Sequence, residues 1–314
     1  MKKIITLIAV VVLSIKGYSQ SIKPAQFEWV EFATVDTTFE KAAILVPVYL
    51  KGVDDKYFMQ LDLGSDATMF YGIPFEQISK THPFLRKDIK TILKYNRKVK
   101  VVPVNGKLGS YTLKSDTFYI KQNYGDSLNP DSKFNVIGTV GLDIFRNRIL
   151  MIDFVDQKFA IADTVAQFDQ NFLTNTDTIA IKLIFNKMFV SGIKIGDQPL
   201  NNIIYDSGSS IFTLVVTKEK WQKLTGRTGD EVDNIVIKIP AWQKEIKVIG
   251  APLKENLFLG NLKVEHPVIF YGVLEELDLS KVPFKLEGLI GNVLFLDSII
   301  IIDFKNKVMM IKSK

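Results

Sequence analysis

The chain has 314 residues, of which 47% are hydrophobic and 24% charged, a composition typical of a chain that folds around a core and not of a disordered one. Its formal net charge of +6 favours acidic partners only weakly and says little about the fold. The lack of cysteine excludes disulfides, thiolate nucleophiles and cysteine-ligated metal sites.

The start of the chain predicts a signal peptide over residues 1–19. Lys2 and Lys3 give it a positive beginning, an apolar run covers Ile4–Ile15, and small residues precede Gln20, which is the pattern of a secretory signal. The run is shorter than the about 20 residues that cross a bilayer. We therefore expect export, to the periplasm or out of the cell, with no stable membrane insertion after cleavage.

Along the rest of the chain, apolar runs of strand length indicate β-structure. These runs cover Ala43–Tyr49, Val99–Val104, Ile179–Phe185, Asn234–Ile239 and Val308–Ile311. Only short helices are expected. Pro74 favours one over Phe75–Lys80, and Thr217 can cap another over Lys218–Leu224. The sequence therefore predicts an all-β fold with few short helices.

One pattern occurs twice in the chain, which is the mark of an internal repeat. In each copy a strand, a turn glycine and a second strand lead to Asp-x-Gly-Ser, at Asp62–Ser65 and again at Asp206–Ser209. The turn glycines, Gly52 and Gly196, lie ten residues before their aspartates (62 − 52 and 206 − 196). The spacing favours duplication over chance resemblance between two hairpins.

A second pair of matching blocks follows in the same order. Gly141 precedes Asp153 by 12 residues, and Gly291 precedes Asp303 by the same number (153 − 141 and 303 − 291). We interpret these two aspartates as hairpin residues and not as a second site. The repeat predicts an N-terminal lobe over residues 20–165 and a C-terminal lobe over residues 166–314, separated within a polar stretch.

The duplicated loops point to carboxylate chemistry. Glycine two residues after the aspartate lets the backbone turn and bring an N–H against the carboxylate, and the following serine hydroxyl can donate to it. Loops related by a pseudo-two-fold axis would place Asp62 and Asp206 face to face. Two carboxyl groups about 3 Å apart share one proton, and such a pair can activate water by general acid–base catalysis.

At these residues the chain resembles the pepsin-like and retropepsin-like aspartic protease family. The signature of that family is Asp-Thr/Ser-Gly-Thr/Ser, followed later by an apolar-apolar-Gly block. Asp206–Ser209 fits the signature, Asp62–Ser65 fits it except at one position, and Thr139–Gly141 and Leu289–Gly291 occupy the later block. The resemblance extends from about Val46 to the end of the chain.

The resemblance implies a bilobal pepsin-like acid-protease fold and an aspartic endopeptidase. It implies that Asp62 and Asp206 are the catalytic residues, that the substrate is a peptide or protein, that no cofactor is needed, and that the protein is a monomer. The residues that would support the active-site loops are Gly64, Ser65, Ser207, Gly208 and Ser209.

Two features depart from the family pattern. The residue after each catalytic aspartate is normally a hydroxyl that bonds to the opposite loop, which Ser207 can do and Leu63 cannot. A flap hairpin is expected over Arg97–Tyr111 with its turn at Asn105–Gly106, but the family's tyrosine is missing near that turn. The alternative is a catalytically silent pepsin-fold protein that binds peptide or polysaccharide. A glycoside hydrolase, with carboxyl groups about 5–9.5 Å apart, is a third hypothesis.

Other signals in the sequence predict no second activity. His82 and His266 each adjoin proline and form no zinc-ligand pattern, so no metal site is expected. No segment resembles a nucleic-acid-binding module, and nucleic acid is not an expected partner. The basic residues from Arg86 to Lys100 are interpreted as one solvated helical face.

Overall fold

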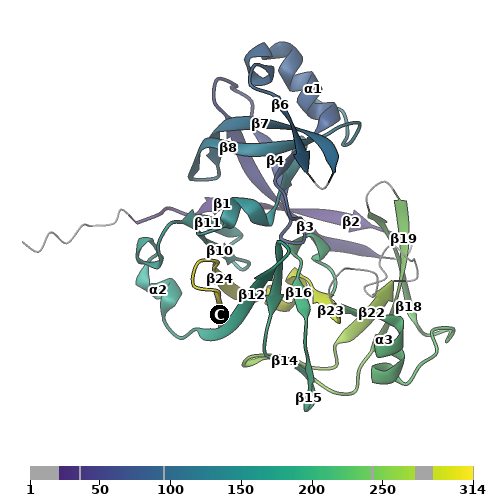
Figure 1. The fold of residues 1–314 in the computed structure, drawn as a ribbon. Coiled ribbons are helices and arrows are strands. Elements are labelled where there is room, and N and C mark those ends of the chain that lie inside the picture. The colour runs from purple at the N-terminus through teal and green to yellow at the C-terminus, as the bar shows by residue number, and fades with distance from the viewer. Residues whose placement is uncertain (1–20, 35–36, 95, 242–243, 273–285, 314) are drawn as a thin grey trace, which may run out of the picture.

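The computed structural model describes residues 21–313 except 35–36, 95, 242–243 and 273–285, so the predicted signal peptide lies outside the described residues. The described chain forms three β-sheets and contains three α-helices (Figure 1). The predicted all-β class is therefore confirmed. None of the helices in these ranges is long and apolar enough to cross a bilayer.

The helices, marked α for α-helices and η for 3₁₀-helices, are short connections between strands. The elements of the first half are β1 (Ala25–Gln26), β2 (Glu28–Ala33), β3 (Thr38–Leu50), β4 (Tyr57–Leu61), β5 (Met69–Tyr71), α1 (Gly72–Thr81), η1 (Pro83–Arg86), β6 (Lys90–Lys94), β7 (Arg97–Leu108), β8 (Tyr111–Lys121), β9 (Val136–Val140), η2 (Leu142–Phe145), β10 (Ile149–Asp153) and β11 (Lys158–Ala162). The elements of the second half are η3 (Val165–Gln167), α2 (Gln170–Leu173), β12 (Asp177–Ile184), β13 (Lys187–Val190), β14 (Ile193–Ile195), β15 (Gln198–Leu200), β16 (Ile203–Tyr205), η4 (Ser207–Ser209), β17 (Leu214–Val216), α3 (Lys218–Thr225), β18 (Ile235–Ala241), β19 (Lys244–Pro252), β20 (Leu257–Leu259), β21 (Leu262–Val264), β22 (Val268–Gly272), β23 (Gly288–Ile290), η7 (Asn292–Phe295), β24 (Ser298–Asp303) and β25 (Val308–Ser313).

The local sequence explains the elements that it predicted. The five predicted strands are present as β3, β7, β12, β18 and β25, and the two predicted helices as α1 and α3. In α3 the Thr217 hydroxyl accepts a hydrogen bond from the Lys220 N–H, which satisfies one of the free donors at the helix start. The helix ends at Gly226, whose left-handed conformation suits glycine.

The two halves of the chain have the same strand order. One sheet runs β2-β3-β4-β9-β5-β8-β7-β6, and the corresponding run in the largest sheet is β12-β13-β16-β23-β17-β22-β19-β18. The register repeats as well: Leu45 lies opposite Gln60, and Phe189 lies opposite Ile204, each 144 residues later (189 − 45 and 204 − 60). The sequence repeat is therefore a repeat of structure.

Strands β10 and β24 join the halves. They are antiparallel, with Met151 opposite Ile301, two residues that are equivalent in the repeat because the offset here is 150 (301 − 151). The register is symmetric about this pair, because Ile149 lies opposite Asp303 and Asp153 lies opposite Ile299. A pseudo-two-fold axis therefore passes between β10 and β24.

The two strand-end aspartates of this sheet serve their own turns, as the sequence predicted. Asp153 Oδ1 accepts hydrogen bonds from the N–H groups of Val155 and Asp156, and Asp303 Oδ1 accepts one from the N–H of Asn306. Because the two aspartates lie at opposite ends of the β10–β24 pair, they do not form a second carboxylate pair.

The core is continuous between the halves. The largest hydrophobic cluster includes Phe70 and Phe118 of the first half together with Trp221 and Phe295 of the second. Phe39 of β3 packs against a further cluster that belongs to the second half, and β2 and β3 extend towards β19 in Figure 1. Each half is therefore packed against the other as well as within itself.

The predicted turn at Asn105–Gly106 was wrong. Both residues lie inside β7, and the β7–β8 hairpin closes beyond Leu108. Glycine is needed here because β7 pairs with β3 as well as with β8: a Cβ on Gly106 would lie 2.0 Å from the carbonyl oxygen of Tyr49. A close approach of two strands, and not a turn, explains the Asn-Gly pair.

The predicted helical face between Arg86 and Lys100 was also wrong. After the short η1, β6 and β7 form an antiparallel hairpin in which Lys90 lies opposite Val101. The alternation of basic and apolar residues along β7 has the period of a strand.

Candidate active site

Asp62 and Asp206 meet between the two halves of the chain. Asp62 follows the buried end of β4, and Asp206 follows the buried end of β16. Each carboxyl group lies against the loop glycine that follows the other aspartate, and the charge of Asp206 acts on Asp62. Both residues are partly exposed, so water can reach them. The structure thus brings together the two aspartates that the sequence singled out.

The two loop glycines permit this close approach. A Cβ on Gly64 would lie 2.2 Å from Asp206 Oδ1, and a Cβ on Gly208 would lie 2.7 Å from Asp62 Oδ1. Both distances are shorter than the 3.0 Å below which Cβ contacts essentially never occur. Each glycine is required by the carboxyl group of the opposite loop, in addition to the turn in its own loop that the sequence predicted.

The two carboxyl groups have unequal hydrogen-bond partners. Asp206 accepts from the Gly208 N–H and from the Ser209 hydroxyl, each at 2.9 Å. Asp62 accepts from the Ser65 N–H at 3.0 Å, whereas the Ser65 hydroxyl donates to the carbonyl of Ala67. The expected bond from hydroxyl to carboxyl is therefore present for Ser209, and the expectation was wrong for Ser65, whose hydroxyl is committed to its own loop.

The side chain of Ser207 makes hydrogen bonds to the opposite loop, whereas the side chain of Leu63 makes none in return. The fully buried Ser207 hydroxyl accepts from the Leu63 N–H at 2.9 Å and donates to the Leu61 carbonyl at 3.0 Å. The side chain of Leu63 is also fully buried, within the main hydrophobic cluster, and has no polar atom to return these bonds. The Asp206 loop therefore braces the Asp62 loop without a matching bond from position 63.

The surroundings of Asp62 favour its protonated form. Burial, the negative charge of Asp206 and the hydrogen bond with Asp206 raise the pKa of Asp62 from 3.8 to about 8. The Ser65 N–H and the positive charge of Lys187 act in the opposite direction. Since like charges this close cannot both ionise readily, the pair holds one proton jointly at neutral pH.

A buried amide that the sequence reasoning missed supports the Asp206 loop. Asn292, in η7, donates to the Ser207 carbonyl at 3.0 Å and to the Ser210 hydroxyl at 2.6 Å, and it accepts from the Tyr205 hydroxyl at 2.5 Å. Its position directly after the Gly291 block was the available signal. These bonds satisfy the polar atoms of a fully buried side chain, as burial requires.

The Asp62 loop is supported by different groups, which were also missed. Asp143 accepts from the Thr68 hydroxyl at 2.6 Å and from the Thr68 N–H at 2.7 Å. The same hydroxyl accepts from the Gly141 N–H at 3.0 Å. Burial raises the pKa of Asp143, although the bonds from Thr68 oppose the shift. No spacing rule connects Thr68 with Asp143 in the sequence.

Further side chains surround the pair. The Tyr71 hydroxyl is hydrogen-bonded to the Thr139 hydroxyl at 2.7 Å, and its ring packs edge-on against Tyr124 with centroids 4.8 Å apart. Burial is the main cause that raises the pKa of Tyr71 to about 12, and the charge of Asp62 contributes. From the second half, the Lys187 ammonium donates to the carbonyl of Gly64.

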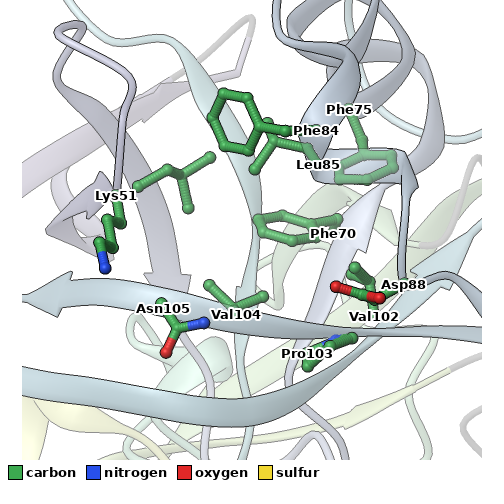
Figure 2. Close-up of a pocket in the computed structure, with 11 residues that line it drawn as sticks. Lys51, Phe70, Phe75, Phe84, Leu85, Asp88, Val102, Pro103, Val104 and Asn105 are labelled. Carbon is green, nitrogen blue, oxygen red and sulfur yellow. The ribbon is translucent and has the colours of Figure 1, made fainter.

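A separate cavity lies in the first half, beside α1 and η1. It measures about 140 Å³ and is lined mainly by apolar side chains, among them Phe70, Phe75 and Phe84 (Figure 2). Phe70 and Tyr71 are neighbours in β5, so their side chains point to opposite faces of the sheet. The cavity is therefore separated by β5 from the groups around Asp62.

The geometry bears on one of the sequence hypotheses. Each carboxyl group lies against the loop of the other, an approach that suits a shared proton better than the separation of about 5–9.5 Å that glycoside hydrolysis requires. Within the described ranges, no group of three or more His, Asp or Glu side chains is placed to hold a metal ion.

The chain was also compared with known proteins. No protein-family model matches it, and no curated protein matches its sequence.

Proposed function

We propose that the protein is an exported aspartic endopeptidase with a bilobal pepsin-like fold, its lobes being residues 20–165 and 166–314. The observation that carries the proposal is the meeting of Asp62 and Asp206 between two equivalent loops, each carboxyl group lying against the glycine of the other loop. The repeated strand order of the two halves supports the bilobal fold. Because both loops belong to one chain, the pair is complete in a monomer.

The reaction would use water as the nucleophile. A water between the carboxyl groups loses a proton to the charged aspartate and attacks the carbonyl carbon of a peptide bond. The protonated aspartate donates its proton first to the developing oxyanion, and the leaving amine then takes up a proton as the C–N bond breaks. No covalent intermediate and no cofactor is needed, because the chain's own carboxyl groups supply both the acid and the base.

The loop residues position the pair for this chemistry. Gly64 and Gly208 allow the carboxyl groups to approach, and Ser209 orients that of Asp206. Ser207 ties the loops together, and the N–H of Ser65 orients Asp62. The substrate is a peptide or protein that reaches the pair from its exposed side.

Substitution of either aspartate tests the proposal. Asp62→Asn and Asp206→Asn should each lower kcat for peptide hydrolysis by at least about a thousandfold, because the pair then lacks either its acid or its base. The measurement uses mature protein and a broad peptide library between acid and neutral pH. The control is Asp131→Asn, at an exposed aspartate, and circular dichroism checks the fold of every variant. Wild-type turnover by either pair variant would rule out the mechanism.

The second hypothesis is a silent protein that binds peptide or polysaccharide. The observation that favours it is the apolar, buried side chain of Leu63. It cannot return the hydrogen bonds that the Ser207 hydroxyl makes to the opposite loop. The same library distinguishes the two hypotheses. Binding of peptides or oligosaccharides without cleavage at any pH would favour the silent protein, whereas cleavage that disappears in both pair variants would favour the peptidase.

A further inference from the structure

One side chain near the carboxyl pair breaks the symmetry between the halves. The β3–β4 and β13–β16 pairs share their register with an offset of 144 residues, so Lys187 of β13 occupies the position of Ala43 in β3 (187 − 144). The first half thus has a methyl group where the second half has a long cationic side chain. No pattern in the sequence marks this difference, because it appears only when the strands are aligned by register.

Lys187 reaches across the axis into the first half. Its ammonium donates to the carbonyl of Gly64, the residue whose backbone lies against the Asp206 carboxyl group. The neighbouring Asn186 accepts a hydrogen bond from Arg146 of the first half. The turn between β12 and β13 is therefore bound to the first half at two points, one of which is the Asp62 loop itself.

The contact of Lys187 adds to the hydrogen bonds that hold the two loops together. Ser207 binds the backbone on both sides of Asp62, at Leu61 and Leu63. In a symmetric arrangement the side chain at position 63 would add a second pair of crossing bonds, but Leu63 is buried and apolar. The hydrogen bond from Lys187 to Gly64 supplies an additional tie to the same loop from a different strand.

The charge of Lys187 also acts on the pair. Among the residues that the structure describes, the titratable groups that interact with Asp62 are Asp206 between β16 and η4, Tyr71 from β5, Tyr124 from the loop after β8, and Lys187 from β13. Of these four, the first three are acids and Lys187 is a cation. Its positive charge lowers the pKa of Asp62 against the stronger effects of burial and Asp206.

We propose that Lys187 is a positioning residue that, alongside Ser207, ties the Asp62 loop to the second half, and that its charge lowers the pH range over which the pair holds a single proton. The effect on the proton of Asp62 stands independently of any activity. The effect on the pH range of peptide hydrolysis rests on the proposed function.

The first test measures the proton of Asp62 directly. Protein labelled with ¹³C at the aspartate carboxyl carbons is titrated by NMR, and the Asp62 signal is assigned by its absence in Asp62→Asn. Lys187→Met should raise the titration midpoint of Asp62 by about one pH unit, the lower end of the effect of an opposite charge nearby. Lys187→Arg should restore the midpoint of the wild type, since arginine keeps the charge and the donor.

The control is Lys194→Met, which removes the same charge from an exposed position on β14. It should leave the midpoint unchanged. An unchanged midpoint in Lys187→Met, or an equal shift in Lys194→Met, would overturn the proposal. Amide spectra of each variant show whether the fold is retained. If Lys187→Met does not fold, Lys187→Arg becomes the test: an Asp62 midpoint in Lys187→Arg that differs from the wild-type value would also overturn the proposal.

The second test is the pH dependence of peptide hydrolysis. Lys187→Met should move both limbs of the pH profile of kcat/KM to higher pH, whereas a residue with only a structural role would lower the rate without moving the limbs. If the wild-type protein cleaves no peptide, the proposed function fails, but the NMR titration still tests whether Lys187 lowers the titration midpoint of Asp62. If the wild type cleaves peptides and the limbs of Lys187→Met stay in place, the inference fails and the proposed function stands.

Discussion

At the scale of single residues, Gly64 and Gly208 lie against carboxyl groups that belong to the other half of the chain. A methyl group at either position would occupy the space of a carboxyl oxygen. The geometry of the pair therefore depends on the lack of a Cβ at Gly64 and Gly208 as much as on the two aspartates. Glycine is commonly required for the turn it allows, but here the contact across the axis adds a second requirement.

Gly64→Ala should separate the carboxyl groups. Because the added Cβ would lie 2.2 Å from Asp206 Oδ1, we expect kcat to fall by about a hundredfold or more and the free energy of unfolding to fall by about 1–3 kcal/mol. Peptide cleavage and urea unfolding measure the two effects. In the control, Gly192→Ala, the nearest atom lies 3.6 Å away but φ is +77°, so stability should fall with activity retained. Equal losses of activity in both variants would contradict the argument.

The raised pKa of Asp62 predicts how stability depends on pH. Between 3.8 and about 8 the folded protein keeps a proton that the unfolded chain has released, so the contribution of Asp62 to stability is complete below pH 3.8 and is lost as pH rises towards 8. Asp62→Asn removes this titration. Urea unfolding at several pH values should show a smaller decline from pH 4 to pH 8 in Asp62→Asn than in the wild type. The exposed-site variant Asp131→Asn should decline as the wild type does, and parallel curves for all three proteins would contradict the prediction.

At this scale the sequence identified the residues with a fixed spacing. Asp62, Asp206 and their glycines stand at equal intervals in both copies, so the pattern itself revealed them. Thr68, Asp143 and Lys187 do not, because their contacts are made by the fold between segments far apart in the chain. Ser65 matched the pattern of Ser209 and yet bonds elsewhere, which a pattern of residue types cannot reveal.

At the scale of elements, strands could be predicted where one physical cause dominates. β3 is buried without interruption from Ile44 to Val48, and the continuous apolar run there favours a buried strand. The basic hairpin of β6 and β7 was misread because charge was weighed before the alternation of apolar residues. The role of Gly106 was predicted wrongly because a turn and a close approach of two paired strands both select glycine, and only the position of β3 distinguishes them.

The pairing of β10 with β24 belongs to the scale of the whole molecule, because it connects the two halves through a shared core. Ile301 lies on the pseudo-two-fold axis and is 1% exposed. Ile301→Asp buries a charge there, which should lower the free energy of unfolding by more than about 3 kcal/mol. Hydrogen exchange should then rise in β4 and β16 together, since Ile300 and Ile302, the residues on either side of Ile301, belong to one hydrophobic cluster with residues of both strands.

The matched control is Ile235→Asp, which makes the same change at an exposed residue of β18. It should leave the exchange rates of β4 and β16 near those of the wild type. Loss of protection in β16 with full protection in β4 would mean that the halves unfold independently, against the prediction.

Met151 and Ile301 occupy equivalent positions of the repeat and lie opposite each other. A chain of half this length would therefore present the matching surface to a second copy of itself. Joining both copies in one polypeptide lets each be altered without altering the other. Two differences of this kind are Ser207, whose equivalent in the first half is Leu63, and Lys187, whose equivalent is Ala43. The two sides of the carboxyl pair consequently carry different side chains. A polymer bound across the pair therefore meets different residues on one side than on the other. Such a centre can distinguish the direction in which a peptide backbone runs, which two identical halves could not do.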